Sequence, residues 1–273
     1  MKKYCLFFCV SFFLFGFGCT SKPIETELVA DEITKPIVET ADSSTDISFV
    51  SIEETFLLPV LLFHHISTPP DGLSESAKQW YVSEEKFEEV LLFLQEHDWH
   101  PIVVSELMGY LGKNNIPEHA IILTFDDGAA DFYTTAFPLL KKYDTKSVMH
   151  IMTSVHSDNW MTAKQIQELD ATGLVEFGSH TKYHEYLTRV STEKARKEME
   201  ESKASLEKLL EKPVYSIGYP FGLYDESIMS LAKELEYTVG FSLRSGFEQD
   251  REEMLEMKRT IITENTNISD LLF

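Results

Sequence analysis

The sequence predicts an α/β fold in which strand–helix units repeat about seven times within one domain. From Pro59 onward, short apolar segments alternate with amphipathic segments whose apolar residues recur at helical spacing. Four of the five residues from 121 to 125 are apolar, which is typical of a strand covered on both faces of a parallel sheet. With 273 residues and 43% hydrophobic composition, the chain can fill a single large core.

The expected strands are the short apolar segments of this array. They cover residues 60–63, 102–104, 121–125, 147–152, 174–177, 214–219, 237–241 and 260–262.

The expected helices begin at residues with capping side chains. Ser83 and Asp225 are N-cap residues, Thr162 and Gln165 form a capping box, and Pro138 begins a new turn within a longer helical segment. The helical segments start near residues 83, 105, 132, 162, 192 and 225.

The first 55 residues are expected to lie outside the folded domain, which then covers 56–273. Residues 1–18 combine two lysines with an apolar run shorter than the roughly 20 residues of a membrane span, the pattern of an export signal. Cys19 resembles the lipidated cysteine of a bacterial lipoprotein, with secretory cleavage or an uncleaved anchor as alternatives. Residues 19–55 are acidic and contain one aromatic residue, Phe49, so we expect a flexible tether.

The charge excludes some partners. A formal net charge of −21 disfavours nucleic acid and anionic lipid, so contact with a membrane is expected only through the lipid anchor. A cationic polymer would be attracted, although an acidic surface also keeps an exported protein soluble. Cys5 and Cys9 lie in the leader, so the folded part has no disulfide, and we expect a monomer.

Two adjacent carboxylates are the first candidate functional groups. Asp126 and Asp127 follow the 121–125 strand directly, and Gly128 lets the chain turn sharply behind them. They should therefore lie at the carboxyl edge of the sheet, where α/β folds bind ligands. Two neighbouring carboxylates repel each other and need a cation or a shared proton. Taken alone, Asp-Asp-Gly is also a common turn sequence.

His180 and His184 provide the candidate cation ligands. They follow the apolar segment 174–177, and their spacing can turn two imidazoles toward one ion. With one aspartate they would form a three-ligand site that keeps a position open for water, as catalytic zinc sites do. We expect one divalent ion, zinc first, with cobalt, nickel or iron as alternatives. Two solvated surface histidines are the alternative interpretation of this spacing.

Three segments together resemble the polysaccharide deacetylase family with its NodB homology domain. They are 124–128, 179–184 and 219–222, and the similarity spans about residues 59–262. The lead-in at 61–66 resembles the branch that acts on poly-N-acetylglucosamine. The resemblance implies a deformed (β/α) barrel that removes acetyl groups from an N-acetylglucosamine polysaccharide, which could be poly-N-acetylglucosamine, peptidoglycan or a chitin-like chain, at the cell envelope or outside the cell.

The resemblance also implies roles for individual residues. Asp127, His180 and His184 would bind the ion, and Asp126 would be the general base. The backbone N–H of Phe221 would stabilise the oxyanion. The neighbouring residues of that segment, which would shape its turn and contact the substrate, are Tyr219, Pro220 and Gly222.

The general acid is expected at an early histidine, as in the poly-N-acetylglucosamine branch. His64 matches that position, and His65 is the second choice because strand alternation lets only one of the two face the site. The family's usual arginine before the third segment is missing, and Arg259 could replace it by position. The remaining histidines lack partners at ligand spacing and are expected to be structural: His97, His100, His119, His150 and His156.

The alternative interpretation is a protein of another class on the same scaffold, namely a carbohydrate-binding or adhesion lipoprotein without turnover. Asp126 argues against it, because binding a sugar or a metal needs no free base beside the metal ligand Asp127.

Overall fold

The computed structural model describes residues 47–155 and 157–273. They belong to a compact unit that spans Asp46–Phe273. The predicted leader, Cys19, the tether up to residue 46, and His156 lie outside the described residues. No helix in the described ranges is long and apolar enough to cross a membrane.

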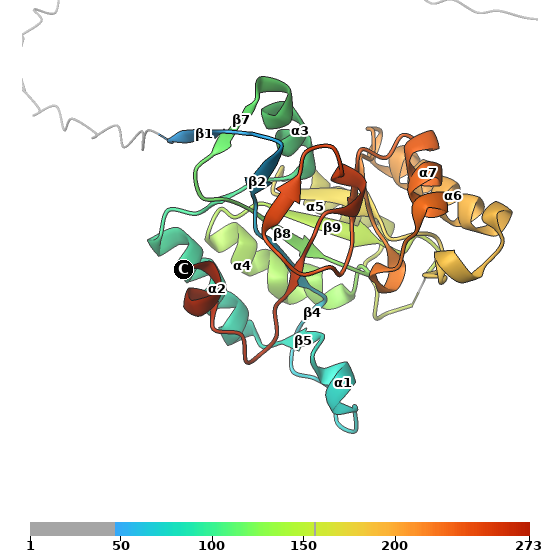
Figure 1. Cartoon of the computed structure of the whole chain (residues 1–273). Helices are drawn as coiled ribbons and strands as arrows, with labels where there is room; N and C mark the ends of the chain where they lie inside the picture. Colours follow the sequence, from blue (N-terminus) through green and yellow to red (C-terminus); the bar gives the residue numbers. More distant parts are fainter. Residues whose placement is uncertain (1–46, 156) are drawn as a thin grey trace, which may run out of the picture. The chain divides into compact units, whose positions relative to one another are not determined.

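A curved parallel sheet forms the centre of this unit (Figure 1). Its strands lie in the order β12-β11-β10-β9-β8-β3-β14, and β6 pairs with β8 beside this path. All of these pairings are parallel. The strands are β3 (Val60–Phe63), β6 (His100–Pro101), β8 (Ala120–Phe125), β9 (Ser147–Ile151), β10 (Val175–Ser179), β11 (Ser216–Gly218), β12 (Val239–Phe241) and β14 (Thr260–Ile261). The predicted α/β class is confirmed.

The segment 257–261 connects the two edges of the sheet. At the β12 edge, the Met257 N–H donates to the Gly240 carbonyl (2.8 Å), and the Ser242 N–H donates to the Met257 carbonyl (2.9 Å). A few residues later, β14 pairs with β3 at the opposite edge. The sheet therefore closes into the expected deformed barrel, and Arg259 lies in the closing segment.

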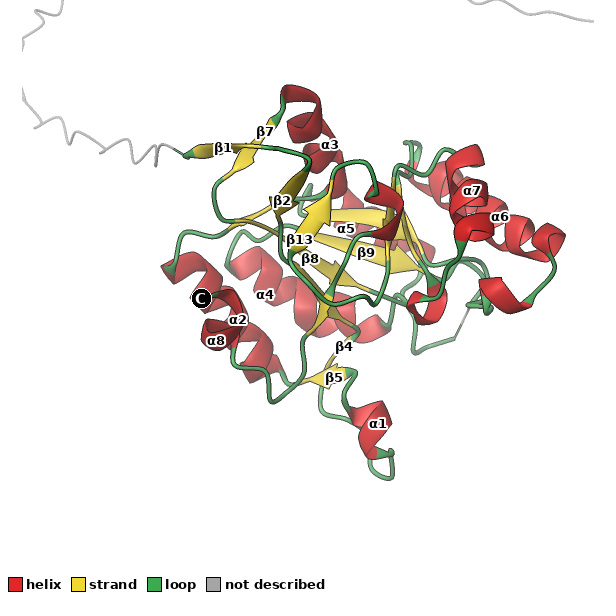
Figure 2. Cartoon of the chain, viewed as in Figure 1, coloured by secondary structure: helices red, strands yellow, loops and turns green. Residues whose placement is uncertain are grey.

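Helices pack around the outside of the barrel (Figure 2). Three predicted caps are present: the side chain of Ser83 accepts from the Lys86 N–H, that of Asp225 accepts from Ile228, and Thr162 forms its capping box. The α-helices are α1 (Glu75–Lys78), α2 (Glu84–Glu96), α3 (Val104–Lys113), α4 (Phe137–Lys142), α5 (Ala163–Asp170), α6 (Thr192–Leu210), α7 (Glu226–Glu234) and α8 (Ile268–Leu272). The π-helix Phe132–Ala136 precedes α4, and 3-10 turns cover Leu187–Arg189, Pro220–Gly222 and Met254–Glu256.

Short strand pairs lie beside the barrel. β1 (Phe49–Ser51) pairs with β7 (Asn115–Pro117), β2 (Thr55–Leu57) pairs with β13 (Glu248–Asp250), and β4 (His65–Ile66) pairs with β5 (Tyr81–Val82).

Alternating side chains of β8 enter two separate cores. Ile121, Leu123 and Phe125 pack in the cluster shared with the outer helices, whereas Ile122 packs in a second cluster that includes residues of α3. Both faces of the strand are buried, as predicted. The same alternation places Thr124 and Asp126 on the side of Ile122, in the barrel interior.

Two sequence predictions about boundaries are wrong. The compact unit begins before residue 56, because β1 pairs with β7 through backbone hydrogen bonds, which an acidic composition does not prevent, and because Ile52 is buried. The apolar run 102–104 is not a strand: β6 ends at Pro101, and α3 already begins at Val104. Ile102 and Val103 are apolar because they pack into the second core as a connecting segment.

Candidate active site

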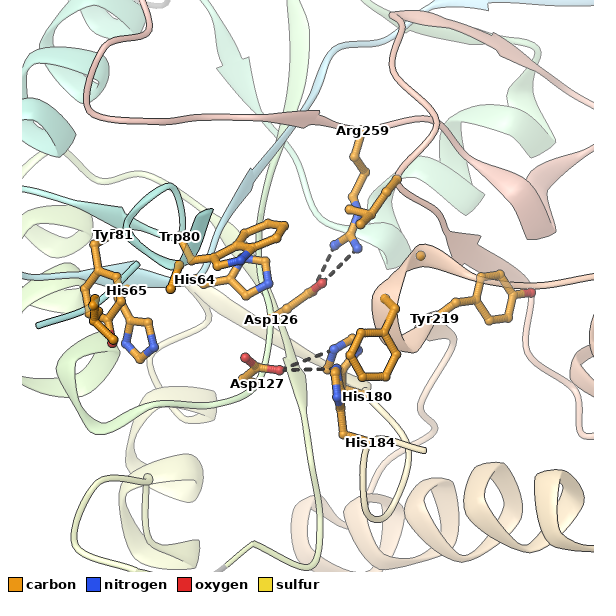
Figure 3. A pocket seen from close by; sticks show the side chains of 15 residues that line it. His64, His65, Trp80, Tyr81, Asp126, Asp127, His180, His184, Tyr219 and Arg259 are labelled. Carbon is orange, nitrogen blue, oxygen red and sulfur yellow. Dashed lines mark hydrogen bonds and ion pairs between the residues drawn. The ribbon is translucent and has the colours of Figure 1, made fainter. Parts of the chain in front are cut away.

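A pocket of about 310 Å³ opens at the carboxyl ends of the strands (Figure 3). It brings together segments that lie far apart in the sequence, from the lead-in after β3 to the closing segment. The predicted site residues that line it are His64, His65, Asp126, Asp127, His180, His184, Tyr219, Phe221 and Gly222. Pro220 is buried and does not line the pocket.

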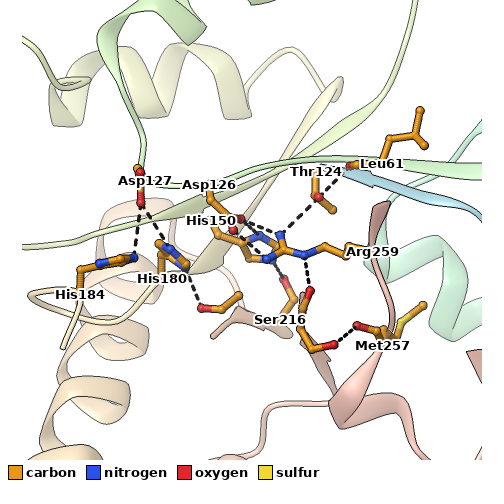
Figure 4. Close-up of polar contacts among 12 residues, drawn as sticks. Leu61, Thr124, Asp126, Asp127, His150, His180, His184, Ser216, Met257 and Arg259 are labelled. Atoms are coloured by element: carbon orange, nitrogen blue, oxygen red, sulfur yellow. Dashed lines mark hydrogen bonds and ion pairs between the residues drawn. The ribbon is translucent and has the colours of Figure 1, made fainter. Parts of the chain in front are cut away.

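Asp127, His180 and His184 form one cluster of candidate metal ligands, whose donor atoms all lie within 4.8 Å of one another. The Asp127 Oδ1 atom lies 3.4 Å from His180 Nε2 and 3.8 Å from His184 Nε2 (Figure 4). The ends of two strands predicted one aspartate and two histidines as ligands, and the family resemblance implied Asp127 as that aspartate. The structure brings them together at one point.

The hydrogen-bond geometry of this cluster fits a divalent cation. The Gly218 carbonyl can only accept, so His180 Nδ1 donates to it (2.7 Å), and Nε2 is the ring nitrogen that faces Asp127. Asp127 Oδ1 is buried and has no hydrogen-bond partner among the described residues. A carboxylate oxygen that faces the Nε2 atoms of two imidazoles is the donor set of a zinc-type site.

The backbone of this cluster is unusual. Asp127, Thr181 and His184 have φ angles of 77°, 65° and 60°, in the left-handed region that non-glycine residues seldom occupy. The Thr181 hydroxyl accepts from the His184 N–H (3.1 Å), which closes a turn that brings His184 back toward His180. Such conformations cost of order 1–3 kcal/mol each and cluster at functional sites.

Asp126 has entirely different partners, although it is the next residue along the chain from Asp127. It is 2% exposed, and both of its oxygens accept from the Arg259 guanidinium at 2.8 Å. Burial alone would raise the pKa of Asp126, but the Arg259 charge holds it well below its usual range. Arg259 therefore takes the place of the missing arginine, as its position suggested.

His150, which was expected to be structural because it has no partner at ligand spacing, also contacts Asp126. Its Nδ1 lies 3.0 Å from Asp126 Oδ1. The sequence carried one signal, since His150 is a polar residue between the apolar residues Met149 and Ile151, on the side that alternation directs into the barrel.

His64 and His65 both line the pocket, so the expectation that only one of them can face it is wrong. His64 lies after the last residue of β3, where strand alternation ends. Its ring packs against Trp80 (4.4 Å between centroids), and its buried Nδ1 has no partner among the described residues. Burial lowers the pKa of His64, while Asp126 and Asp127 act in the opposite direction.

His65 is held by other groups. Its Nδ1 lies 2.9 Å from Asp131 Oδ2, and its ring stacks on Tyr81 at 4.3 Å between centroids with 9° between the planes. The side chain is thus fixed by a carboxylate and an aromatic ring, whereas His64 packs against an aromatic ring and has no carboxylate partner at its Nδ1 among the described residues.

The third segment presents a strained turn at the pocket. Phe221 has a φ angle of 58°, is 39% exposed and stacks on Tyr186 at 3.7 Å with 3° between the rings. Gly222 packs against Leu243. The Tyr219 hydroxyl donates to the Leu255 carbonyl (2.9 Å) and points away from the other pocket residues in Figure 3, so only the body of the ring faces the pocket.

Sequence reasoning did not find several residues of the pocket wall. Trp80 and Tyr81 come from the excursion that includes α1, and Leu243 comes from the segment after β12. The only sequence signal for Trp80 and Tyr81 was that two aromatic residues are adjacent in the segment that follows the two histidines. No ligand spacing relates them to the three motif segments. The other residues of this kind are Leu73 and Ala77.

Comparisons with known proteins agree with this geometry. The family described as polysaccharide deacetylase matches residues 113–240. A Bacillus subtilis (strain 168) protein whose name assigns it to the polysaccharide deacetylases, YxkH, is 27% identical over 215 residues, which cover 78% of this chain and 74% of that protein. The poly-β-1,6-N-acetyl-D-glucosamine N-deacetylase of Staphylococcus aureus is 28% identical over 184 residues. That match covers 62% of this chain and 63% of the staphylococcal protein.

Among solved structures, the Streptococcus pyogenes deacetylase PplD in complex with acetate is similar to the chain with a TM-score of 0.73 and 28% identity. The match covers 80% of this chain and 97% of PplD. The relatives and this structural neighbour are thus deacetylases.

The Arg259–Asp126 pair gives a first testable prediction. Replacing Arg259 with methionine leaves a buried carboxylate without its charge partner, so we expect a loss of about 3–5 kcal/mol in the free energy of unfolding, measured in urea. The same replacement in an Asp126→Asn background should cost much less. Arg196→Met, which breaks an exposed pair with Glu234, should cost at most about 1 kcal/mol. A cost that small for Arg259→Met would contradict the interpretation.

Proposed function

The chain carries a polysaccharide deacetylase domain, and on that premise we propose that it is a metal-dependent enzyme that hydrolyses the acetamide of N-acetylglucosamine units and releases acetate. One observation carries this proposal: two consecutive aspartates have separate partners. Asp126 is bound to an arginine, and Asp127 faces two histidines. A site that only binds sugar has no need for this division.

The residues that would hold the metal are Asp127, His180 and His184. A divalent ion bound there would supply a water of lowered pKa and would polarise the carbonyl of the acetamide. Zinc suits the donor set best, and cobalt, nickel and iron are alternatives that the same ligands accept.

Asp126 then acts as the general base. Arg259 keeps the carboxylate of Asp126 ionised. Because Asp127 would be the carboxylate that binds the metal, Asp126 can accept a proton instead. The O–H bond of the attacking water breaks toward Asp126 while its oxygen bonds to the acetamide carbon. The N–H of Phe221, in the strained turn at the pocket, would donate to the oxyanion that develops.

His64 completes the reaction as general acid. The amine of the sugar is a poor leaving group until it is protonated, so the C–N bond needs a proton donor at its nitrogen. His64 lines the same pocket as Asp126, and its buried Nδ1 has no competing partner among the described residues. Trp80, against which it packs, fixes the ring. Bond cleavage yields acetate and a free amine on the sugar.

The substrate is proposed to be an N-acetylglucosamine polymer outside the cytoplasm, with poly-N-acetylglucosamine favoured over peptidoglycan and chitin-like chains. The name of the staphylococcal relative supports this choice. The leader at 1–18, lipidation at Cys19 and a short acidic tether would hold a monomeric domain at the cell envelope, with no other membrane contact and no nucleic-acid partner.

The two aspartates should respond differently to substitution. Asp127→Ala should lose both metal and acetate release from N-acetylglucosamine oligomers. Asp126→Asn removes the base and leaves all three ligands, so metal content should stay near that of the wild type while turnover falls by roughly 10² to 10⁴. Metal analysis and an acetate assay measure both effects. Loss of metal in Asp126→Asn would reverse the two assignments, and a wild-type protein with metal that releases no acetate would favour a non-catalytic binding protein.

The role of His64 can be tested with two kinds of substrate. His64→Ala should keep its metal and lose roughly 10²-fold or more in turnover on the sugar amide, because the amine leaves poorly without a proton. An activated acetate ester should be affected far less, since its leaving group departs as a stabilised anion. His65→Ala should change amide and ester turnover alike and only slightly. An amide-selective defect in His65→Ala instead of His64→Ala would transfer the role to His65.

A further inference from the structure

His150 is a fully buried polar side chain in the barrel interior, at 0% exposure, directly behind the candidate base. It belongs to β9, next to the strand that carries Asp126, and it touches none of the three candidate metal ligands by a hydrogen bond (Figure 4). Burying an imidazole in this position costs free energy unless both ring nitrogens find partners.

Both nitrogens are paired, and the pairing fixes the tautomer. An ionised carboxylate only accepts, so His150 Nδ1 donates to Asp126 Oδ1 (3.0 Å). His150 Nε2 then carries the lone pair and accepts from the Ser216 hydroxyl (3.3 Å). Burial lowers the pKa of His150 to about 4, which agrees with a neutral ring. The chain of donors runs from Ser216 through His150 to Asp126.

This chain makes the two oxygens of Asp126 unequal. Oδ1 accepts from His150 and from Arg259 Nη1, which occupies both of its lone pairs. Oδ2 accepts only from Arg259 Nη2 among the described residues and keeps a lone pair. The arginine alone would hold the carboxylate symmetrically, so the difference between the oxygens comes from His150.

The neighbouring strands leave room for this arrangement. A Cβ atom at Gly178 would lie 2.5 Å from His150 Cδ2 and 2.4 Å from the Ser216 Oγ atom. A Cβ atom at Gly218 would lie 3.1 Å from His150 Cγ and 3.2 Å from Asp126 Oδ1. The side chains of two adjacent strands are therefore absent where the imidazole lies. The two glycines thus leave the space that the imidazole of His150 occupies.

We propose that His150, supported by Ser216, is a positioning residue that occupies Oδ1 of Asp126, so that Oδ2 is the atom that receives the proton of the attacking water. The water O–H bond breaks and the Oδ2–H bond forms, while His150 keeps its own proton. This inference rests on the proposed role of Asp126 as general base. It identifies which oxygen of Asp126 accepts the proton and which buried residues leave that oxygen available.

Two substitutions of His150 separate positioning from packing. His150→Leu fills much of the space but has no donor, so kcat on N-acetylglucosamine oligomers should fall by about 10-fold or more, with KM and metal content unchanged. His150→Asn places an amide N–H near the position of Nδ1 and should recover most of the loss, to within about threefold of the wild type. Ser216→Ala keeps the imidazole but removes the hydrogen bond to its Nε2, which no longer fixes the tautomer. It should lower kcat by a few-fold.

Ser202→Ala is the matched control. Ser202 is a buried serine whose hydroxyl bonds to another side chain, Ser179 Oγ (2.8 Å), without contact to Asp126. It should reduce the melting temperature as much as Ser216→Ala does and leave kcat unchanged. If His150→Leu does not fold, the comparison of His150→Asn and Ser216→Ala with Ser202→Ala still shows whether kcat depends on the contact with Asp126 or only on stability.

The outcomes are distinct. Wild-type kcat in both His150→Leu and Ser216→Ala would overturn the positioning role while leaving the proposed function intact. Equal loss of kcat in Ser216→Ala and Ser202→Ala would also overturn it, since the effect would then follow stability. No acetate release from the wild type with its metal would refute the proposed function itself.

Discussion

The buried ion pair between Arg259 and Asp126 is the interaction on which the rest of the site depends. A carboxylate inside the barrel is tolerable only if a cation lies within hydrogen-bonding distance, and Arg259 meets this need through two bonds at 2.8 Å. Arg259 is itself 1% exposed and comes from the segment that joins the two edges of the sheet. The segment that closes the barrel therefore also carries the cation that stabilises the charge of the candidate base.

This pairing also explains how two consecutive aspartates can differ. Strand alternation directs Asp126 into the barrel, toward Arg259 and His150. Asp127 has left the strand in a left-handed conformation and turns toward His180 and His184. Because Arg259 already neutralises Asp126, a metal ion at the proposed site would have to balance only the charge of Asp127. One short motif at the end of β8 thus provides both a candidate metal ligand and an independent carboxylate, and of these two residues only Asp127 has a left-handed backbone conformation.

Much of the site could be predicted from local sequence patterns, and the limits of that prediction are physical. The strand ending in Asp126 and Asp127, and the pair His180 and His184, are contiguous signals whose spacing reflects local backbone geometry. Arg259 was suggested only by its position in the chain, and its contact with Asp126 could not be predicted from a local pattern because the two residues lie 133 positions apart. The contacts of His150 were not predicted, since its partner Ser216 comes from a strand that is not its neighbour in the sheet order.

The central claim is that Asp127 binds the metal while Asp126 remains paired with Arg259, and a crystal grown with zinc tests it most directly. Anomalous diffraction locates the ion without assumptions about the protein. We expect a peak at zinc-ligand distances, about 2.0–2.2 Å, from Asp127, His180 and His184, with both oxygens of Asp126 still bound to Arg259. A peak coordinated by Asp126, with Arg259 displaced from it, would contradict the account.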